Sequence, residues 1–266
     1  MWKAVSGSNV VYLLGSIHLG SPDMYPLPKV IDDAFARSKA MVVEVNMNNL
    51  DPGEASKFIM EKGMYTDEDT LWKHLSKPTG DKVKKFFTNY GMDETAAGKF
   101  KPWLAGIMSS VLPMMKAGMN ADLGIDKHFL DLAKGKKKVE QAESMDFQLK
   151  LLSSMTDSVA DVYLSYTVGE VAKSKEQDLK LERLWKKGDA EALNKEISVH
   201  PKELDGLMRS LLEDRNPHMA DVAEKYLKNG GGPCFFVVGA AHLIGKEGVV
   251  AILQKRGYNI YQVAAN

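Results

Sequence analysis

Two histidines occupy equivalent positions near opposite ends of the chain. His18 lies in "YLLGSIHLG" and His242 in "VVGAAHLIG", so each follows an apolar run, a glycine and two further residues. A GxxH match alone has little weight among 22 glycines and 6 histidines. The shared context adds weight, because a leucine and then another glycine follow each histidine. A neutral imidazole is the commonest protein ligand of a metal ion. The pattern therefore predicts a site built from both histidines, with two histidines packed near a core as the alternative.

A carboxylate is expected in the same site. Glu44 interrupts the apolar run "MVVEV", where a buried carboxylate is costly unless it is paired or bound to an ion. If the strand at 40–45 lies beside the strand at 9–14, Glu44 and His18 meet at one edge of the sheet. We therefore assign His18, Glu44 and His242 to a metal site. A structural Glu44 paired with a lysine or arginine is the alternative.

The residues around each histidine predict the same order of elements, which is strand, GxxH loop, helix and strand. Apolar periodicity places the first set, with a hairpin strand before it, at 2–6, 9–14, 28–38 and 40–45. It places the second set at 234–239, 245–256 and 258–263. Two such βα repeats predict an α/β protein with a mostly parallel sheet and helices on its faces. Open α/β sheets bind their ligands at the carboxyl ends of the strands, where both histidines fall.

The stretch between the repeats, at about 50–230, has mostly helical periodicity. We expect it to form a helical cap, with 1–50 and 231–266 as the sheet core of a single domain, 1–266. The predicted helix at 101–119 carries Met114 and Met115. These methionines either pack in the core or line a cleft for an extended, variable substrate, because methionine adapts to many shapes.

Composition argues against several classes of protein. Lys plus Arg equals Asp plus Glu, 35 each, which gives no support to a nucleic-acid binder. The single cysteine, Cys234, permits no internal disulfide. No apolar stretch reaches the roughly 18 residues of a membrane span. The sequence begins almost directly in a strand, which suits a secreted or cell-envelope protein whose leader has been removed. The compartment and the oligomeric state stay open.

Further residues carry a resemblance to a known family. They lie in "YLLGSIHLG" with His18, "VVEV" with Glu44, "LGID" with Asp126, "VEQAE" with Glu140, "DRNPHMA" with Arg215 and Asn216, and "VVGAAHLIGKEGVVAILQKRGY" with His242. In this order, over residues 2–263, the chain resembles the TraB/GumN family, to which the Tiki-type metalloproteases belong. It is also similar to the wider erythromycin-esterase/ChaN-like fold group.

The resemblance implies a mixed sheet built from two βα repeats under a helical cap, and a metal-dependent hydrolase that cleaves peptide bonds. It suggests Mn²⁺ or Co²⁺ as the ion, with Zn²⁺ also compatible, and a peptide or protein as the substrate. Glu140 would then act as general base if its environment raises its pKa. Arg215 would stabilise the oxyanion or fix a substrate carboxylate. Asn216 would orient one of these groups, and Asp126 would support a ligand or its helix.

Two other classes of function remain alternatives. One is a metal-free hydrolase of the erythromycin-esterase type, in which His18 or His242 acts directly as the base. The other is a haem- or metal-binding protein of the ChaN type, with a histidine or tyrosine as axial ligand. The sequence contains no HExxH, P-loop, GxGxxG or GxSxG motif that would point to another chemistry.

Overall fold

A computed structural model describes residues 1–49, 51–171 and 174–264. In that part of the chain, six strands form one sheet in the order β4-β3-β5-β2-β1-β6. The strands are β1 (Trp2–Ser6), β2 (Asn9–Ser16), β3 (Ala40–Val43), β4 (Lys138–Gln141), β5 (Cys234–Gly239) and β6 (Asn259–Gln262). The four strands from β4 to β2 are parallel, whereas β1 pairs antiparallel with both β2 and β6. The predicted α/β class with a mostly parallel mixed sheet is confirmed.

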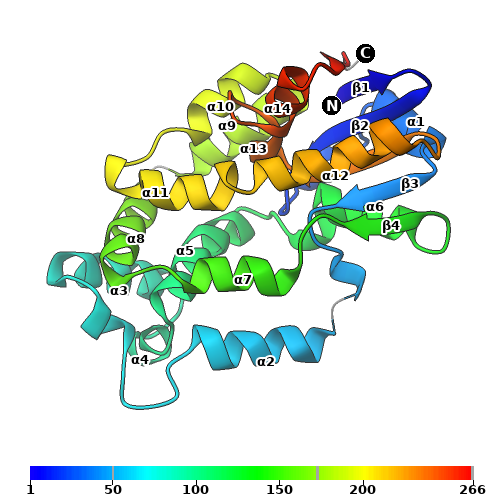
Figure 1. The fold of residues 1–266 in the computed structure, drawn as a ribbon. Helices are drawn as coiled ribbons and strands as arrows, with labels where there is room; N and C mark the ends of the chain where they lie inside the picture. Colours follow the sequence, from blue (N-terminus) through cyan, green and yellow to red (C-terminus); the bar gives the residue numbers. More distant parts are fainter. Residues whose placement is uncertain (50, 172–173, 265–266) are drawn as a thin grey trace.

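Helices surround this sheet and continue into a second, all-helical layer (Figure 1). Beside the sheet lie α1 (Lys29–Arg37), α6 (Ile125–Ala133), α12 (Asn216–Asn229), α13 (Ala240–Leu243) and α14 (Val249–Lys255). The intervening region contains α2 (Pro52–Gly63), α3 (Lys77–Asn89), α4 (Glu94–Gly98), α5 (Pro102–Lys116), α7 (Met145–Ser153), α8 (Asp157–Val171), α9 (Ser174–Lys187), α10 (Ala190–Ile197) and α11 (Asp205–Met208). A π-helical turn, Arg209–Glu213, joins α11 to the residue before α12.

The central strand β5 shows why the sheet is buried on both faces. Its side chains alternate between two cores, with Phe236 and Val238 on the side of α12 and α14, and Phe235 and Val237 on the side of α1 and α6. A strand covered by helices on both faces reads as a continuous apolar run, as "CFFVV" does. On the α1/α6 side, the Phe35 and Phe129 rings pack against Phe235 with centroids 5.5 and 4.8 Å from it.

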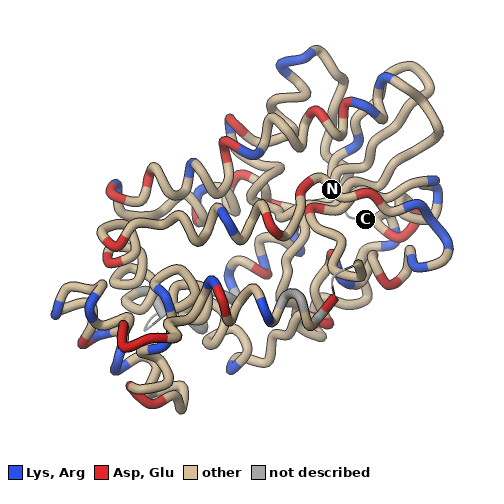
Figure 2. The backbone as a smooth tube through the Cα atoms, turned by 60° about the horizontal axis from the view of Figure 1, so that its bottom comes forward, with Lys and Arg blue, Asp and Glu red and all other residues tan. Residues whose placement is uncertain are grey.

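The helices α3, α4, α5 and α8 enclose a third apolar core of their own. Its fully buried members include Leu71, Val83, Phe87 and Leu164. The close approach of α5 to α8 depends on Gly106, because a Cβ there would lie 2.4 Å from the Tyr163 ring. Acidic and basic residues are mixed over all these elements (Figure 2). None of the helices in the described ranges is both long and apolar enough to cross a membrane.

His74 joins two parts of this helical region through both of its ring nitrogens. Nδ1 lies 2.7 Å from an Asp157 oxygen and Nε2 lies 3.0 Å from an Asp69 oxygen. Donation to both carboxylates requires the charged imidazolium. The hydrogen bond to Asp157 is the largest contribution to a raised His74 pKa; burial opposes it, and Asp69 adds to it.

We expect this bridge to stabilise the fold in a pH-dependent way. Since the folded pKa is raised, the contribution is fully present below the unfolded value of about 6.5 and is lost as pH rises through the folded pKa. Denaturant unfolding of wild type and His74→Asn across pH should show the largest difference in free energy at acid pH. A difference that stays constant from about pH 5 to 9 would contradict the charged bridge.

Candidate functional site

The sheet order brings three strand ends to one place. Strand β5 lies between β2 and β3, with Ser16 beside Gly239 and Val43 beside Val237. The loops that carry His18, His242 and Glu44 therefore leave the same edge of the sheet. Gly239 marks the point where they converge, because a Cβ there would lie 3.4 Å from Glu44 Oε2, 3.5 Å from His242 Cδ2 and 3.9 Å from His18 Nε2. The structure thus brings together the three residues assigned to a metal around Gly239, where even a Cβ would be in van der Waals contact with all of them.

The second glycine of the first motif has a structural task as well. At Gly20, a Cβ would lie 2.0 Å from the Leu123 carbonyl oxygen. The missing side chain allows Gly20 to exchange two backbone hydrogen bonds with Asn120, at 3.0 and 2.9 Å. The Ile125 N–H then donates to the Ile17 carbonyl at 3.0 Å. This pairing fixes the His18 loop against the start of α6.

As a consequence, Asp126 in the first turn of α6 meets the exposed His18 ring. Nδ1 of His18 lies 3.0 Å from Asp126 Oδ1. This hydrogen bond is the main cause that raises the pKa of His18 to about 9, and the charges of Asp126 and Glu44 add to it. With Nδ1–H donated to Asp126, Nε2 is the nitrogen that faces the other site residues.

His242 is held in a comparable way but is buried, with 3% of its surface exposed. Its Nδ1 lies 2.7 Å from Asn216 Oδ1, and the Asn216 amide donates to the Glu247 carbonyl at 2.8 Å. Asn216 therefore accepts the Nδ1 proton and leaves Nε2 with a free lone pair. Burial is the main cause that lowers the pKa of His242 to about 4. The expected orienting role of Asn216 corresponds to this contact.

Glu44 belongs to a buried network of charged and polar side chains. Its Oε1 accepts from Arg215 Nη2 at 2.6 Å and from Gln148 Nε2 at 2.7 Å, and its Oε2 accepts from the Gly239 N–H at 3.0 Å. Burial alone would raise the pKa of Glu44, but neighbouring His242 and Arg215, together with the Gly239 N–H, give a net lowering. Glu44 thus keeps its charge, and Oε1 lies 3.8 Å from His242 Nε2.

Arg215 binds a second carboxylate that the sequence did not suggest. Its Nε donates to Glu143 Oε1 at 2.9 Å and its Nη1 donates to the Leu211 carbonyl at 2.6 Å. Gln148 also donates to Glu143, at 3.0 Å. Arg215 therefore holds Glu44 and Glu143 together. Most of its donors are engaged in this way, so its primary effect is on the position of Glu44.

The structure does not bring Glu140 into this site, which corrects our expectation. Its carboxylate pairs with Lys138 and with the Tyr226 hydroxyl, and these hydrogen bonds are the main cause of a lowered Glu140 pKa. Glu140 lies within β4, one residue before the strand ends. The chain reaches the sheet edge only at Glu143, whose N–H donates to the Glu44 carbonyl at 2.9 Å. Searching just beyond the end of the strand, where Glu44 was found, would have selected Glu143.

A cavity of about 460 Å³ opens beside this network. It is lined by Ser16, His18, Glu44, Val45, Met47, Asn48, Ala121, Asp122, Asp126, Lys127, Met145 and Gln148. Neither Met114 nor Met115 contributes to the lining, and Met115 is exposed on α5. The segment that follows α5 borders the cavity instead, through Ala121 and Asp122.

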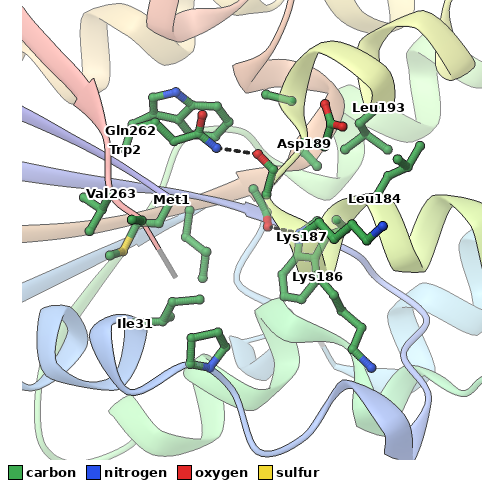
Figure 3. Close-up of a pocket in the computed structure, with 18 of the residues that line it drawn as sticks. Met1, Trp2, Ile31, Leu184, Lys186, Lys187, Asp189, Leu193, Gln262 and Val263 are labelled. Carbon is green, nitrogen blue, oxygen red and sulfur yellow. Dashed lines mark hydrogen bonds between the residues drawn. The ribbon is translucent and has the colours of Figure 1, made fainter. Parts of the chain in front are cut away.

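A larger cavity of about 600 Å³ lies between α9, α1 and the β1/β6 side of the sheet (Figure 3). Its wall is mainly apolar and includes Met1, Trp2, Ile31, Leu184 and Val263. It touches Gly15 and Ala240, which begin the two GxxH loops, but neither histidine lines it. The chemistry predicted from the sequence therefore belongs to the smaller cavity.

A catalytic metal site takes about three protein ligands around one ion. Within the described residues, no three His, Cys, Asp or Glu side chains already stand at ligand spacing. Two donors about 2.1 Å from one ion in tetrahedral geometry are about 3.4 Å apart. Glu44 Oε1 and His242 Nε2, at 3.8 Å, are close to that value. Both histidines also donate Nδ1–H to an oxygen, as metal-bound histidines usually do. Glu44 and His242 therefore fit two ligands of one ion, whereas His18 is not at ligand spacing with them in this structure.

Comparisons with known proteins agree with the sequence motifs. The model of the TraB/PrgY/gumN family matches residues 1–262. YbaP of Escherichia coli (strain K12), which is described as uncharacterized, is 26% identical over 164 residues, or 59% of this chain and 58% of that protein. YbaP of Shigella flexneri matches to the same extent. The match thus spans less than two thirds of these relatives, and no solved structure matches the chain. Because the family model covers nearly its whole length, the chain belongs to the TraB/PrgY/gumN family.

Proposed function

We propose that this protein is a metal-dependent hydrolase that cleaves peptide bonds at the cavity beside His18 and Glu44. The observation that supports it is the convergence of two imidazoles and one carboxylate around Gly239. His18, His242 and Glu44 would hold or adjoin the ion, which is Mn²⁺ or Co²⁺ by resemblance to Tiki-type members, with Zn²⁺ also compatible. When bound, such an ion supplies a water of lowered pKa and polarises the scissile carbonyl.

The surrounding residues prepare the site for this chemistry. Asp126 and Asn216 accept hydrogen bonds from Nδ1 of His18 and His242, which leaves each Nε2 for the site, and the Nε2 proton that the raised pKa of His18 otherwise retains would be replaced by a bound ion. Arg215 and Gln148 hold the Glu44 carboxylate in a single position. Since Glu140 lies elsewhere, we assign proton transfer from an attacking water to Glu44, which lines the cavity and lies 3.8 Å from His242 Nε2. Four of the five N–H groups of Arg215 are engaged by Glu44, Glu143 and the Leu211 carbonyl, and Arg215 is not among the residues that line the cavity, so we assign it to positioning Glu44 rather than to an oxyanion.

The test is metal content measured together with turnover. Freshly purified protein is assayed for bound metal and for cleavage of a diverse set of fluorogenic peptides, before and after chelation. We expect turnover to disappear with the chelator and to return with Mn²⁺ or Co²⁺. His200→Ala serves as control, because His200 pairs with Asp205 outside the site. A protein that cleaves no peptide with any divalent ion would contradict the proposal.

The two carboxylates named from the sequence are expected to differ sharply. Glu44→Gln should weaken metal binding by about 10–100-fold and lower kcat by about 10²–10⁴-fold. Glu140→Gln should leave both quantities near their wild-type values, because the Glu140 carboxylate pairs with Lys138 on the strand. Both are measured on matched preparations. If Glu140→Gln lowers kcat while metal content stays normal, Glu140 is the general base after all.

A metal-free hydrolase is the second candidate, and one observation favours it. The buried His242 keeps a free Nε2 lone pair, whereas the exposed His18 is paired with a carboxylate, so the two imidazoles lie in opposite environments. Acid–base catalysis uses such a difference. Full turnover after exhaustive chelation would support this candidate. The haem-carrier alternative gains no comparable support, since the cavity beside His18 carries Glu44, Asp122 and Asp126.

A further inference from the structure

We propose that the site selects peptides with a large apolar residue next to the scissile bond, and that Met47 and Met145 determine this preference. This inference rests on the proposed function, since it names the substrate class of the same cavity. It follows from the arrangement of the cavity wall. The lining includes the apolar side chains of Val45, Met47 and Met145 together with His18, Asp126 and Lys127.

Both methionines lie close to the reacting groups. Met47 begins a 3-10 turn, Met47–Asn49, three residues after Glu44, and 47% of its surface is exposed. Met145 begins α7, one helical turn before Gln148, which donates to Glu44 at 2.7 Å. A side chain adjacent to a carbonyl held at Glu44 would therefore contact these methionines. It would cover apolar surface on Met47 that water contacts in the free protein.

The acidic residues of the lining act against acidic substrate side chains. Asp126 is paired with His18, and Lys127 is paired with Asp131. Asp122 also lines the cavity and makes no ion pair with any residue that the structure describes. An Asp or Glu side chain beside the scissile bond would be repelled by this charge, while Lys127 is already engaged by Asp131. Unbranched methionines also adapt to different shapes, so Leu, Met and Phe should all be accepted.

The experiment compares kcat/KM for quenched fluorescent peptides that differ only at the residues flanking the scissile bond. Leu, Phe, Gln, Lys and Glu are placed in turn on each side. Wild type should prefer Leu or Phe over Glu at one of these positions. Met47→Gln and Met145→Gln should each reduce that ratio by about 10-fold, which is in the range for losing one apolar contact in a pocket. Met47→Leu should preserve it.

Met115→Gln is the matched control, because Met115 is 55% exposed on α5 and does not line the cavity. Its ratio should equal that of wild type. Cleavage of all peptides at equal rates, or an unchanged ratio in both glutamine variants, would overturn this inference while the proposed function stands. If no peptide is cleaved under any condition, the proposed function falls and this inference falls with it.

Discussion

Replacing His242 with alanine should lower kcat by about 10²–10⁴-fold, whether the ring holds an ion or acts as a base. The ring is buried, and its Nε2 is 3.8 Å from Glu44 Oε1. His18→Ala should have an effect of similar size, because His18 Nε2 faces the same point. Turnover and bound metal are measured on both variants, next to wild type.

The effect of each substitution on folding stability has to be measured separately from its effect on turnover. His242→Ala leaves the Asn216 oxygen without its partner, which costs about 1–3 kcal/mol when the group is buried. Thermal unfolding of each variant therefore accompanies the kinetics. His200→Ala, with its ring paired to Asp205 elsewhere, should retain turnover. A folded His242→Ala protein with wild-type turnover would rule out a role for this ring in catalysis.

The strands that carry the site, and the position of Glu44 at a strand end, could be predicted from the sequence. Apolar runs that end in glycine predicted β2 and β5, and the alternation of Glu44 with valines placed this carboxylate at a strand end. Such signals come from residues adjacent in the chain, where periodicity and turn chemistry decide the structure. Glu140 and Glu143 differ because β4 ends at Gln141, which leaves Glu140 within the strand and Glu143 beyond it.

The strand order and the contacts between residues far apart in the chain could not be predicted. Insertion of β5 between β2 and β3 pairs residues almost 200 positions apart, and no local pattern specifies such an order. Gln148 reaches Glu44 only because α7 packs beside the sheet edge, and its sequence context is that of an ordinary helix. The same holds for Met47 and Met145. Methionines were expected along the cleft, but those that line it come from other segments than the predicted helix at 101–119.

Replacing Arg215 with methionine should destabilise the fold by about 3–5 kcal/mol, the cost of removing one partner from a buried ion pair. The Arg215 side chain is 10% exposed and bridges Glu44 and Glu143, whose side chains are 12% and 3% exposed. Without the guanidinium, two buried carboxylates would remain next to each other, with only Gln148 donating to both. Methionine keeps much of the side-chain volume, so the loss of stability is caused mainly by removal of the positive charge. Denaturant unfolding at neutral pH measures it.

Arg209→Met is the matched control for this variant. Arg209 lies six residues earlier in the chain and pairs with Asp214, but its side chain is 69% exposed, so its loss should cost only about 0–1 kcal/mol. The deficit of Arg215→Met should also depend on pH. Arg215 is one of the causes that lower the pKa of Glu44 in wild type, so without it Glu44 is protonated more readily, the repulsion is relieved at low pH and the deficit shrinks as pH falls. Adding Glu143→Gln should restore part of the stability at neutral pH, because one buried charge is removed. Equal and pH-independent losses in Arg215→Met and Arg209→Met would show that Arg215 acts as a packing residue, and that Glu44 does not depend on it for its position.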